Sequence, residues 1–538
     1  MAPAAATASP VVAISAPGKV LFAGGFLVLD RQHTGLVFGL DARIHVLIEP
    51  VGHQRRLSGT GRDEVRVMVR SPQFDGAVWS YAIRSGDGEV SVVQVVDEVG
   101  DGQAHTKNKF VETALRYALT YLAYATEHSS EDRQNGHAGQ GRVLGKGDIQ
   151  ITVLADDDYY SSSSPSQESD DAPALQQHTA QSRRFKSFNT TLPNAHKTGL
   201  GSSAALTTAL VGAILEFYLS SDTTISNDSS TNHPSSHSET TNSFSAVSPS
   251  RKSQIHNLAQ AAHSAAQGKV GSGFDVAAAV FGSCLYRRFS PAVLEQIGEA
   301  DSEGFSGRLY RCVENVAAED GEGLKWNAEV KENGVAIPEG LRLVLCDVDC
   351  GSETPSMVRK MLQWRKARPD ESERIWGNLL QSQEELCREL TRLSKSMPTN
   401  SQQTDTTIDN RYARLKQIIS VMRHLVQQMT ASSGVPVEPP PITALLDHVS
   451  AIRGIIGGVA PGAGGYDAVA LLVEDRPEII KELEGSLEGW KWTANDNEAK
   501  IAEEGPEIGK VRLLGVRQAS EGVWREEVED GGRYAGWR

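Results

Sequence analysis

The sequence has few cysteines, no long apolar run and no surplus of positive charge. Its five irregularly spaced cysteines are too few for a disulfide scaffold, which favours a reducing compartment. No stretch approaches the roughly 18 apolar residues that a membrane-spanning helix needs. The net charge of −15 argues against a nucleic-acid-binding protein, because such proteins cluster Lys and Arg. We therefore expect a soluble cytoplasmic protein without a membrane span.

Apolar periodicity predicts a mixed α and β chain of 538 residues in two lobes, 1–334 and 335–538. Strands are predicted at 11–15 and 20–29, around a tight turn at Pro17-Gly18, and at 148–154, 341–348 and 510–516. Helical spacing predicts helices at 108–126, 203–219, 354–366, 370–394, 408–430 and 476–486.

Two polar insertions interrupt the first lobe. Residues 155–190 contain an Asp/Ser-rich run, and 20 of the 31 residues in 220–250 are Ser, Thr or Asn. Such segments bury too little apolar surface to offset the loss of chain entropy. We expect both to be disordered surface loops, with a regulatory phosphorylation segment as the alternative.

The most informative stretch is a glycine-rich loop that leads directly into an apolar helix. It comprises Lys197, Thr198, Gly199, Leu200, Gly201, Ser202, Ser203, Ala204 and Ala205. Small residues let the backbone approach an anion, and the free N–H groups of a helix start attract negative charge. The two serine hydroxyls could cap the helix, bind phosphate oxygens or ligate Mg²⁺. The alternative is an ordinary helix cap.

Two common nucleotide motifs are absent. The stretch GQGRVLGKG at 139–147 lacks the glycine spacing and the Ser or Thr of a phosphate-binding P-loop. The 197–205 loop lacks the acidic partner about 20 residues on that a dinucleotide fingerprint requires. A different class of nucleotide loop is therefore expected.

Three further stretches combine glycine with chemically active side chains. Lys19 follows Pro17-Gly18, Asp275 follows the glycines of 268–273, and PGAGGYD occupies 461–467 before a predicted strand. Each also has a purely structural interpretation. Lys19 alone would be a solvated turn lysine, Asp275 a helix cap, and 461–467 a hairpin turn.

Taken together, these stretches resemble the GHMP kinase superfamily. The matching motifs are SAPGKVLFAGG (15–25), KTGLGSSAA (197–205) and GVAPGAGGYDA (458–468). Within that superfamily the chain resembles the fungal phosphomevalonate kinases over nearly its whole length. The supporting stretches are GGFLVLD (24–30), HNLAQAAHSAAQGKVGSGFDVAAAVFGS (256–283), YRRF (286–289), GSET (351–354) and EPP (438–440).

The resemblance implies a two-lobed α+β fold. The N-terminal lobe would be ribosomal-S5-domain-2-like and the C-terminal lobe ferredoxin-like. The implied reaction transfers the γ-phosphoryl group of ATP to (R)-5-phosphomevalonate, with Mg²⁺, in the pathway to isoprenoids and sterols. The partner is thus a small-molecule substrate.

The resemblance also implies roles for individual residues. Lys19 and Asp275 would be catalytic, the 197–205 loop would bind ATP, and Ser202 would bind the metal. Residues expected to bind the acceptor are Lys109, Lys269, Ser272, Gly462, Ala463 and Gly464. Further cations that could balance the acceptor's charge are Lys197, Arg43 and Arg288.

Two departures separate the chain from mevalonate kinases and galactokinases. Their Gly-Glu-His stretch reads Gly24-Gly25-Phe26 here, and the metal-binding glutamate of mevalonate kinases is Ser264. The second metal ligand is therefore left open among Ser202, Asp275 and water. Two alternatives remain: another small-molecule kinase of this fold, such as a mevalonate kinase, and an inactive ATP-binding sensor.

Overall fold

The computed structural model describes most of the chain. The described residues are 11–51, 64–86, 89–95, 107–128, 146–161, 184–219, 246–316, 323, 325–350, 354–396, 405–492 and 509–538. The central parts of both predicted insertions, and residues 351–353 of the GSET stretch, lie outside them.

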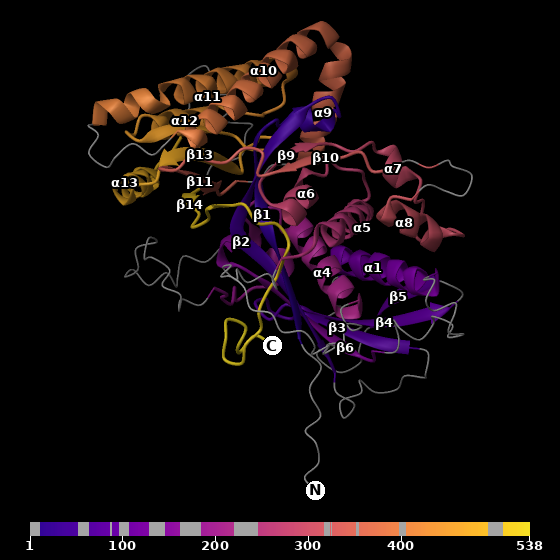
Figure 1. Ribbon diagram of the computed structural model, residues 1–538. Coiled ribbons are helices and arrows are strands. Elements are labelled where there is room, and N and C mark those ends of the chain that lie inside the picture. The colour runs from indigo at the N-terminus through magenta and orange to yellow at the C-terminus, as the bar shows by residue number, and fades with distance from the viewer. Residues whose placement is uncertain are drawn as a thin grey trace, which may run out of the picture.

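The N-terminal lobe is built on one large sheet, which runs in Figure 1 from β9 and β10 near the top to β3 and β4 near the bottom. Its principal strands run in the spatial order β10 (Glu329–Glu332), β9 (Cys284–Arg287), β2 (Thr34–Pro50), β6 (Ile149–Ala155), β3 (Glu64–Arg70), β4 (Val78–Gly86) and β5 (Glu89–Val95). Strand β1 (Val12–Ala23) pairs with β2 beside this row. All pairs are antiparallel except β3 with β6.

Alternating residues bury both faces of the central strands. Ile14, Val46 and Ile48 belong to the main core under the helices. Helices α1 (Lys109–His128), α4 (Ser202–Leu219) and α6 (Phe274–Phe281) pack on the strands, and α5 (Pro249–Gln267) and α8 (Phe305–Glu314) pack on those helices. Ala13 and Leu47 point the other way, into a smaller core with Tyr534. Successive residues of the central strands therefore point to opposite faces of the sheet, and both faces are buried.

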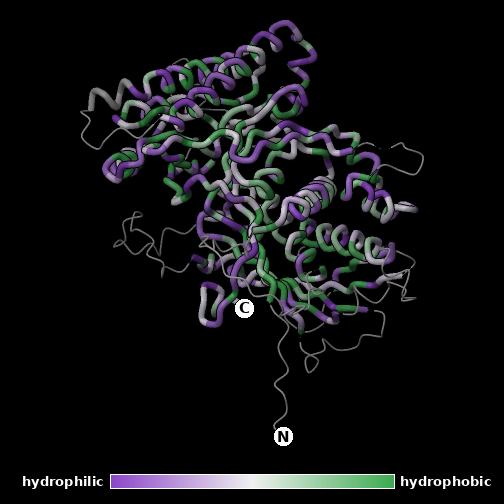
Figure 2. The backbone as a smooth tube through the Cα atoms, in the orientation of Figure 1, coloured by the Kyte–Doolittle hydropathy of each residue, from purple (hydrophilic) through white to green (hydrophobic). Residues whose placement is uncertain are grey.

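Helix α4 is the central helix of this lobe. Within the described residues it is the single helix long and apolar enough to span a membrane. It is mostly buried, and it packs on β1, β2, α1 and α5. Figure 2 shows the same hydrophobic interior running through the lobe.

The C-terminal lobe is a four-stranded antiparallel sheet between helical layers. Its order is β12 (Ile455–Val459), β13 (Ala468–Glu474), β11 (Leu341–Val348) and β14 (Val511–Leu513). One face packs on α12 (Pro440–Ser450) and α13 (Pro477–Leu487). The other face meets α11 (Asp405–Ser433), which pairs with α10 (Pro369–Lys395), while α9 (Thr354–Ala367) precedes them. The predicted helices and the mixed α+β class are confirmed.

The chain end returns to the N-terminal lobe, so the predicted lobe 335–538 is too long at its end. Strand β15 (Gln518–Ala519) pairs with β2, and β16 (Trp524–Arg525) pairs with β1. Gly522 makes the close approach possible, because a Cβ there would lie 2.0 Å from the Val280 carbonyl oxygen. In Figure 1 this yellow segment runs down beside β1 and β2.

The prediction of a tight turn at Pro17-Gly18 is wrong. Strand β1 continues through it, with a shift in register between Pro17 and Lys19. The pairing is irregular at the proline, which cannot donate a ladder hydrogen bond. Gly18 gives room to Leu200, whose carbonyl oxygen would lie 3.2 Å from an added Cβ. Only the stretch after Ala23 leaves the strand, as a turn into the short helix η1 (Phe26–Leu29).

The ends of both predicted insertions have defined structure, contrary to the prediction. Residues 155–161 form the end of β6, the short helix η3 (Asp157–Tyr159) and β7 (Tyr160–Ser161). Phe185 and Phe188, at the other end of the same insertion, are buried. At the other insertion, Ser248 caps α5 by accepting a hydrogen bond from the Arg251 N–H. These ends contain buried aromatic or helix-capping residues, which the polar composition of the whole segment did not indicate.

Candidate active site

Lys19 lies on β1 at the centre of the site. Its backbone N–H donates to the Leu200 carbonyl at 3.0 Å, and its ammonium donates to the Gly199 carbonyl at 3.0 Å. Burial lowers the pKa of the Lys19 ammonium, and the charge of Asp275 opposes that shift. The ammonium also lies 5.7 Å from the Phe274 ring centroid. The structure thus brings the first motif, the glycine-rich loop and Asp275 to one place.

The glycine-rich loop needs its glycines for two different reasons. Gly199 and Gly201 both have left-handed backbones, with φ of 76° and 85°. A Cβ on Gly201 would lie 2.9 Å from the Lys19 Cε, whereas a Cβ on Gly199 would meet nothing within 4 Å. The loop is therefore tight against Lys19 and open at Gly199. Ala204 and Ala205 are buried in α4, which begins at Ser202.

Segment 156–161 packs against the glycine-rich loop and is hydrogen-bonded to it. The Thr198 hydroxyl donates to the Asp158 carbonyl at 2.5 Å, and the Thr198 N–H donates to the Tyr159 carbonyl at 3.2 Å. The Asp158 carboxylate accepts a hydrogen bond from the Gly515 N–H at 2.9 Å. The returning chain end therefore helps to fix the floor of the loop, a role that the sequence does not reveal.

The two loop serines have different partners. Burial raises the pKa of Tyr160, and a side-chain hydrogen bond with Ser202 opposes that rise. Ser203 instead contacts His263, with 3.1 Å between Oγ and Nε2. Both serines line one pocket. His263 stands inside the stretch quoted for the family resemblance, yet nothing in its sequence context distinguished it from other core histidines.

An apolar pocket adjoins the loop on the side of the serines. Aliphatic and aromatic side chains line it, and Asn108, Lys197, Ser71 and the two loop serines supply polar groups. The aromatic lining residues are Phe74, Trp79, Phe110 and Tyr160. A flat heteroaromatic base beside a phosphate loop would find stacking partners and polar edges here.

Asp275 stands in the first turn of α6. Its Oδ1 accepts a hydrogen bond from the Val276 N–H at 3.0 Å, and its side chain is 24% exposed. The preceding Gly273 is crowded, since an added Cβ would lie 2.7 Å from the Tyr286 hydroxyl. Tyr286 donates to the Ser272 carbonyl at 2.8 Å. The entry to α6 is thus held firmly, and Asp275 with it.

The third motif joins the two lobes. The Gly462 N–H donates to the Leu21 carbonyl on β1 at 3.0 Å. A Cβ on Gly464 would lie 2.0 Å from the Val437 carbonyl oxygen, so this position has no space for a side chain. Ala463 packs on the small core that contains Phe26.

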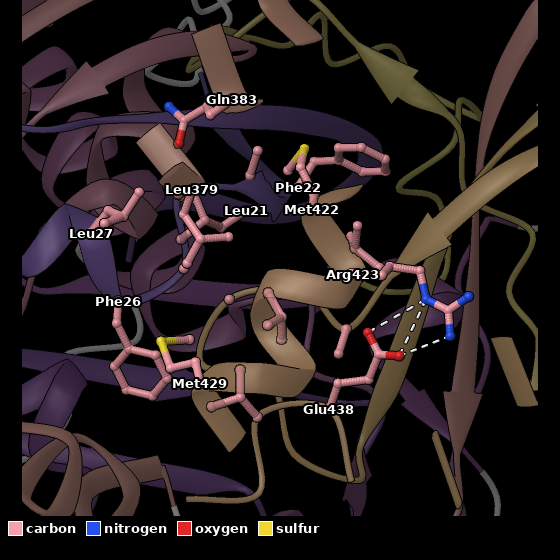
Figure 3. A pocket seen from close by; sticks show the side chains of 18 of the residues that line it. Leu21, Phe22, Phe26, Leu27, Leu379, Gln383, Met422, Arg423, Met429 and Glu438 are labelled. Carbon is pink, nitrogen blue, oxygen red and sulfur yellow. Dashed lines mark hydrogen bonds and ion pairs between the residues drawn. The ribbon is translucent and has the colours of Figure 1, made fainter. Parts of the chain in front are cut away.

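A second apolar pocket lies behind this motif, between the lobes (Figure 3). Phe26 and Met429 lie side by side along its wall, while Gln383 and the Arg423–Glu438 ion pair lie at opposite ends. The pair is 2.8 Å long, and the Glu438 side chain is 1% exposed. The lobes therefore meet here through apolar side chains, and a buried ion pair closes one end of the pocket.

The predicted cations separate into two groups. The side chains of Arg43 and Arg288 are hydrogen-bonded within the protein. Arg43 donates to Ser15 Oγ at 2.7 Å, and Arg288 donates to the Gly271 carbonyl at 2.8 Å. Both are structural, which a list of charges could not show. The three candidate lysines, Lys109, Lys197 and Lys269, are exposed.

The exposed lysines differ in their distance from the loop. Lys197 lines the aromatic pocket. Lys109 opens α1 next to Phe110, which lines the same pocket. Lys269 follows the end of α5 and lines a separate hollow with Ser264 and Glu299. Lys197 is therefore the one of the three that borders both the loop and the pocket.

The oxygen atoms at the site fit a hard divalent cation that is bound mainly through phosphates. In the described part of the chain, no three His, Cys, Asp or Glu side chains form a metal site by themselves. Mg²⁺ commonly keeps several waters and takes one or two carboxylates besides substrate phosphates. The hydroxyls of Ser202 and Ser203 and the Asp275 carboxylate are donors of this kind.

Comparison with known proteins gives a consistent assignment. The chain is 43% identical over 547 aligned residues to the phosphomevalonate kinase of Aspergillus fumigatus, covering 98% of each chain. It is 41% identical over 532 residues to that of Gibberella zeae, covering 98% of this chain and 99% of the relative. No family model matches.

A solved structure supports the fold over almost the whole chain. The Lin0012 protein from Listeria innocua superposes with a TM-score of 0.53 and 14% identity, covering 95% of this chain and 100% of that one. At that identity the likeness concerns the fold alone. The two fungal relatives, however, match over full length and well above 30% identity. This chain belongs to the phosphomevalonate kinase family and has the two-lobed fold of the GHMP kinases.

Proposed function

We propose that this protein transfers the γ-phosphoryl group of ATP to (R)-5-phosphomevalonate, which yields (R)-5-diphosphomevalonate and ADP. The observation that carries the proposal is the convergence of Lys19, the 199–201 loop and Asp275. The two fungal relatives that bear this enzyme name support the choice of acceptor. The cytoplasm is the proposed location, where the five free cysteines stay reduced.

We assign the ATP phosphates to the loop and the base to the aromatic pocket. The open space at Gly199 lets phosphate oxygens reach the backbone, and the start of α4 supplies unpaired N–H groups. Phe110 and Tyr160 would stack on the adenine, while Asn108 contacts its polar edge. The acceptor then lies on the other side of Lys19, towards Ser272 and Gly462–Gly464.

The chemistry asks mainly for positioning and charge neutralisation. Lys19 would neutralise negative charge that builds up between donor and acceptor, and Asp275 favours its charged form. Mg²⁺, when bound, would neutralise the phosphate oxygens, and Ser202, Ser203 and Asp275 are the residues that would hold it. This low-dielectric position strengthens each of these interactions.

Asp275 need not be a general base for this acceptor. A phosphate monoester has a second pKa of about 6, so near pH 7 its attacking oxygen is already mostly deprotonated. An alcohol acceptor would instead benefit from a base. We therefore assign Asp275 to orientation and charge balance. A pH profile of kcat governed by the Asp275 carboxyl rather than by the acceptor phosphate would contradict this assignment.

ADP release from Mg²⁺-ATP tests the proposal, with phosphomevalonate, mevalonate, galactose or no acceptor. We expect turnover with phosphomevalonate alone. Turnover with mevalonate or galactose would replace the proposed acceptor by an alcohol. ATP binding without turnover of any acceptor would indicate an inactive sensor.

A further inference from the structure

Helix α5 places a buried histidine between the nucleotide loop and Asp275. The His263 side chain is 3% exposed. Its Nε2 atom lies 3.1 Å from Ser203 Oγ, 3.3 Å from Gln267 Nε2 and 3.9 Å from Asp275 Oδ2. One nitrogen therefore faces a loop hydroxyl and the proposed catalytic carboxylate together.

The surroundings fix the orientation of this imidazole. Phe110 packs against its ring, with centroids 5.5 Å apart and planes tilted by 31°. Gln267, one turn further along α5, contacts the same Nε2 atom from the helix end. A buried ring held on a helix by an aromatic neighbour has few rotamers to choose from. Its Nε2 atom is therefore a fixed point in the site.

Ser203 gains its orientation from this fixed point. Whichever of the two atoms donates, the hydrogen bond selects one rotamer of an otherwise freely rotating hydroxyl. Ser202 is held separately, by a hydrogen bond with Tyr160. The two serines are thus oriented by different elements, and Ser203 is the one on the side of Asp275.

We propose that His263 is a positioning residue for phosphoryl transfer, acting through the Ser203 hydroxyl. The inference rests on the proposed function only for the identity of the reaction. His263 holds Ser203 in the orientation that the transferred phosphoryl group requires, and it keeps the loop in register with Asp275. Preorganised donors of this kind act without rearrangement during the reaction.

Three substitutions at position 263 separate this role from simple packing. His263→Leu keeps an apolar side chain against Phe110 but removes Nε2. His263→Gln returns an amide at about the reach of Nε2, whereas the shorter amide of His263→Asn does not reach Ser203. We expect H263L to lower kcat about 10-fold, the size of one oriented hydrogen bond, with the acceptor KM within about twofold. H263Q should recover most of kcat, and H263N should not.

A double-mutant cycle tests whether the effect passes through Ser203. We expect H263L to have almost no further effect on kcat when Ser203→Ala is already present, because the hydroxyl that it orients is gone. Losses that multiply would overturn the proposal. So would equal kcat values for wild type, H263L and H263N in folded protein.

His256 provides the matched control on the same helix. It is also buried, and it contacts Asn257 at 3.0 Å rather than the loop. His256→Leu should change the melting temperature without changing kcat of the folded enzyme. A loss of kcat in H256L as large as in H263L would reduce the His263 effect to helix packing.

Failure of the proposed function would be visible separately. If wild type phosphorylates a different acceptor, the ratio of variant to wild-type kcat on that acceptor still tests His263. If no acceptor is turned over, calorimetry with a non-hydrolysable ATP analogue provides the test. We then expect H263L to weaken binding several-fold and H263Q to restore it, and identical affinities would overturn the role.

Discussion

Substitution of Gly201 by alanine should disable the enzyme while leaving it folded. The backbone there has φ of 85°, so an alanine costs about 1–2 kcal/mol of folding free energy in the left-handed conformation. The new Cβ would also lie 2.9 Å from the Lys19 Cε, well inside the optimal carbon–carbon distance of about 3.5–4.0 Å. The Lys19 side chain must therefore move by roughly half an ångström or more.

That displacement is expected to be cheap for stability and costly for catalysis. The end of a lysine side chain yields easily, but its ammonium is bonded to the Gly199 carbonyl and lies against Phe274. A misplacement of about 1 Å can cost about 100-fold in rate. We expect kcat of Gly201→Ala to fall by one to two orders of magnitude at saturating ATP.

Gly199→Ala is the matched control. Its φ of 76° gives the same backbone penalty, yet its Cβ would meet no atom within 4 Å. Both variants should lose similar stability in denaturant unfolding. Only G201A should lose kcat, whereas G199A should affect at most the KM for ATP. Equal losses of kcat in the two variants, or full activity in G201A, would refute the reasoning.

Three further outcomes follow from buried charges. Lys19→Met should lower kcat about 10²–10³-fold, because the ammonium is lost. It should not lower the melting temperature, because burial disfavours the charged form of Lys19, as its lowered pKa shows. A melting temperature several degrees lower would contradict this. Arg423→Met should cost about 3–5 kcal/mol in urea unfolding, because it leaves the buried Glu438 carboxylate without its charged partner, and a loss below about 1 kcal/mol would count against it. Burial lowers the pKa of His45 below 6.5, so below that pH the unfolded state gains a proton that the folded state does not, and stability should fall. Melting temperatures between pH 7.5 and 5.5 should show this slope reduced in His45→Gln, and an unchanged slope would exclude His45 as its source.

Local patterns predicted much of this structure. Helical spacing located α1, α9, α10 and α13 to within a few residues, because each buries one face against a sheet or a neighbouring helix. The glycine-rich loop and the start of α4 were also identifiable, since small residues followed by an apolar helix permit few other structures. Assignment of roles to Lys19 and Asp275 depended on family resemblance, and those roles remain predictions.

Long-range contacts explain what the sequence did not reveal. Pro17-Gly18 is typical of a turn, yet pairing of β1 with β2 on both sides of it keeps the strand continuous. The returning end of the chain contributes only two-residue strands, too short for any periodic signal. His263 resembles any buried helical histidine until α5 is placed beside the loop.

The central claim is that the group phosphorylated is itself a phosphate. The most direct test gives the enzyme Mg²⁺-ATP with equal amounts of phosphomevalonate and mevalonate and follows the products by phosphorus NMR. We expect the coupled signals of a new diphosphate, formed in step with ADP, and no conversion of mevalonate. A phosphomevalonate signal that grows above its starting amount as ADP forms, without the diphosphate signals, would contradict the assignment of acceptor and of Asp275.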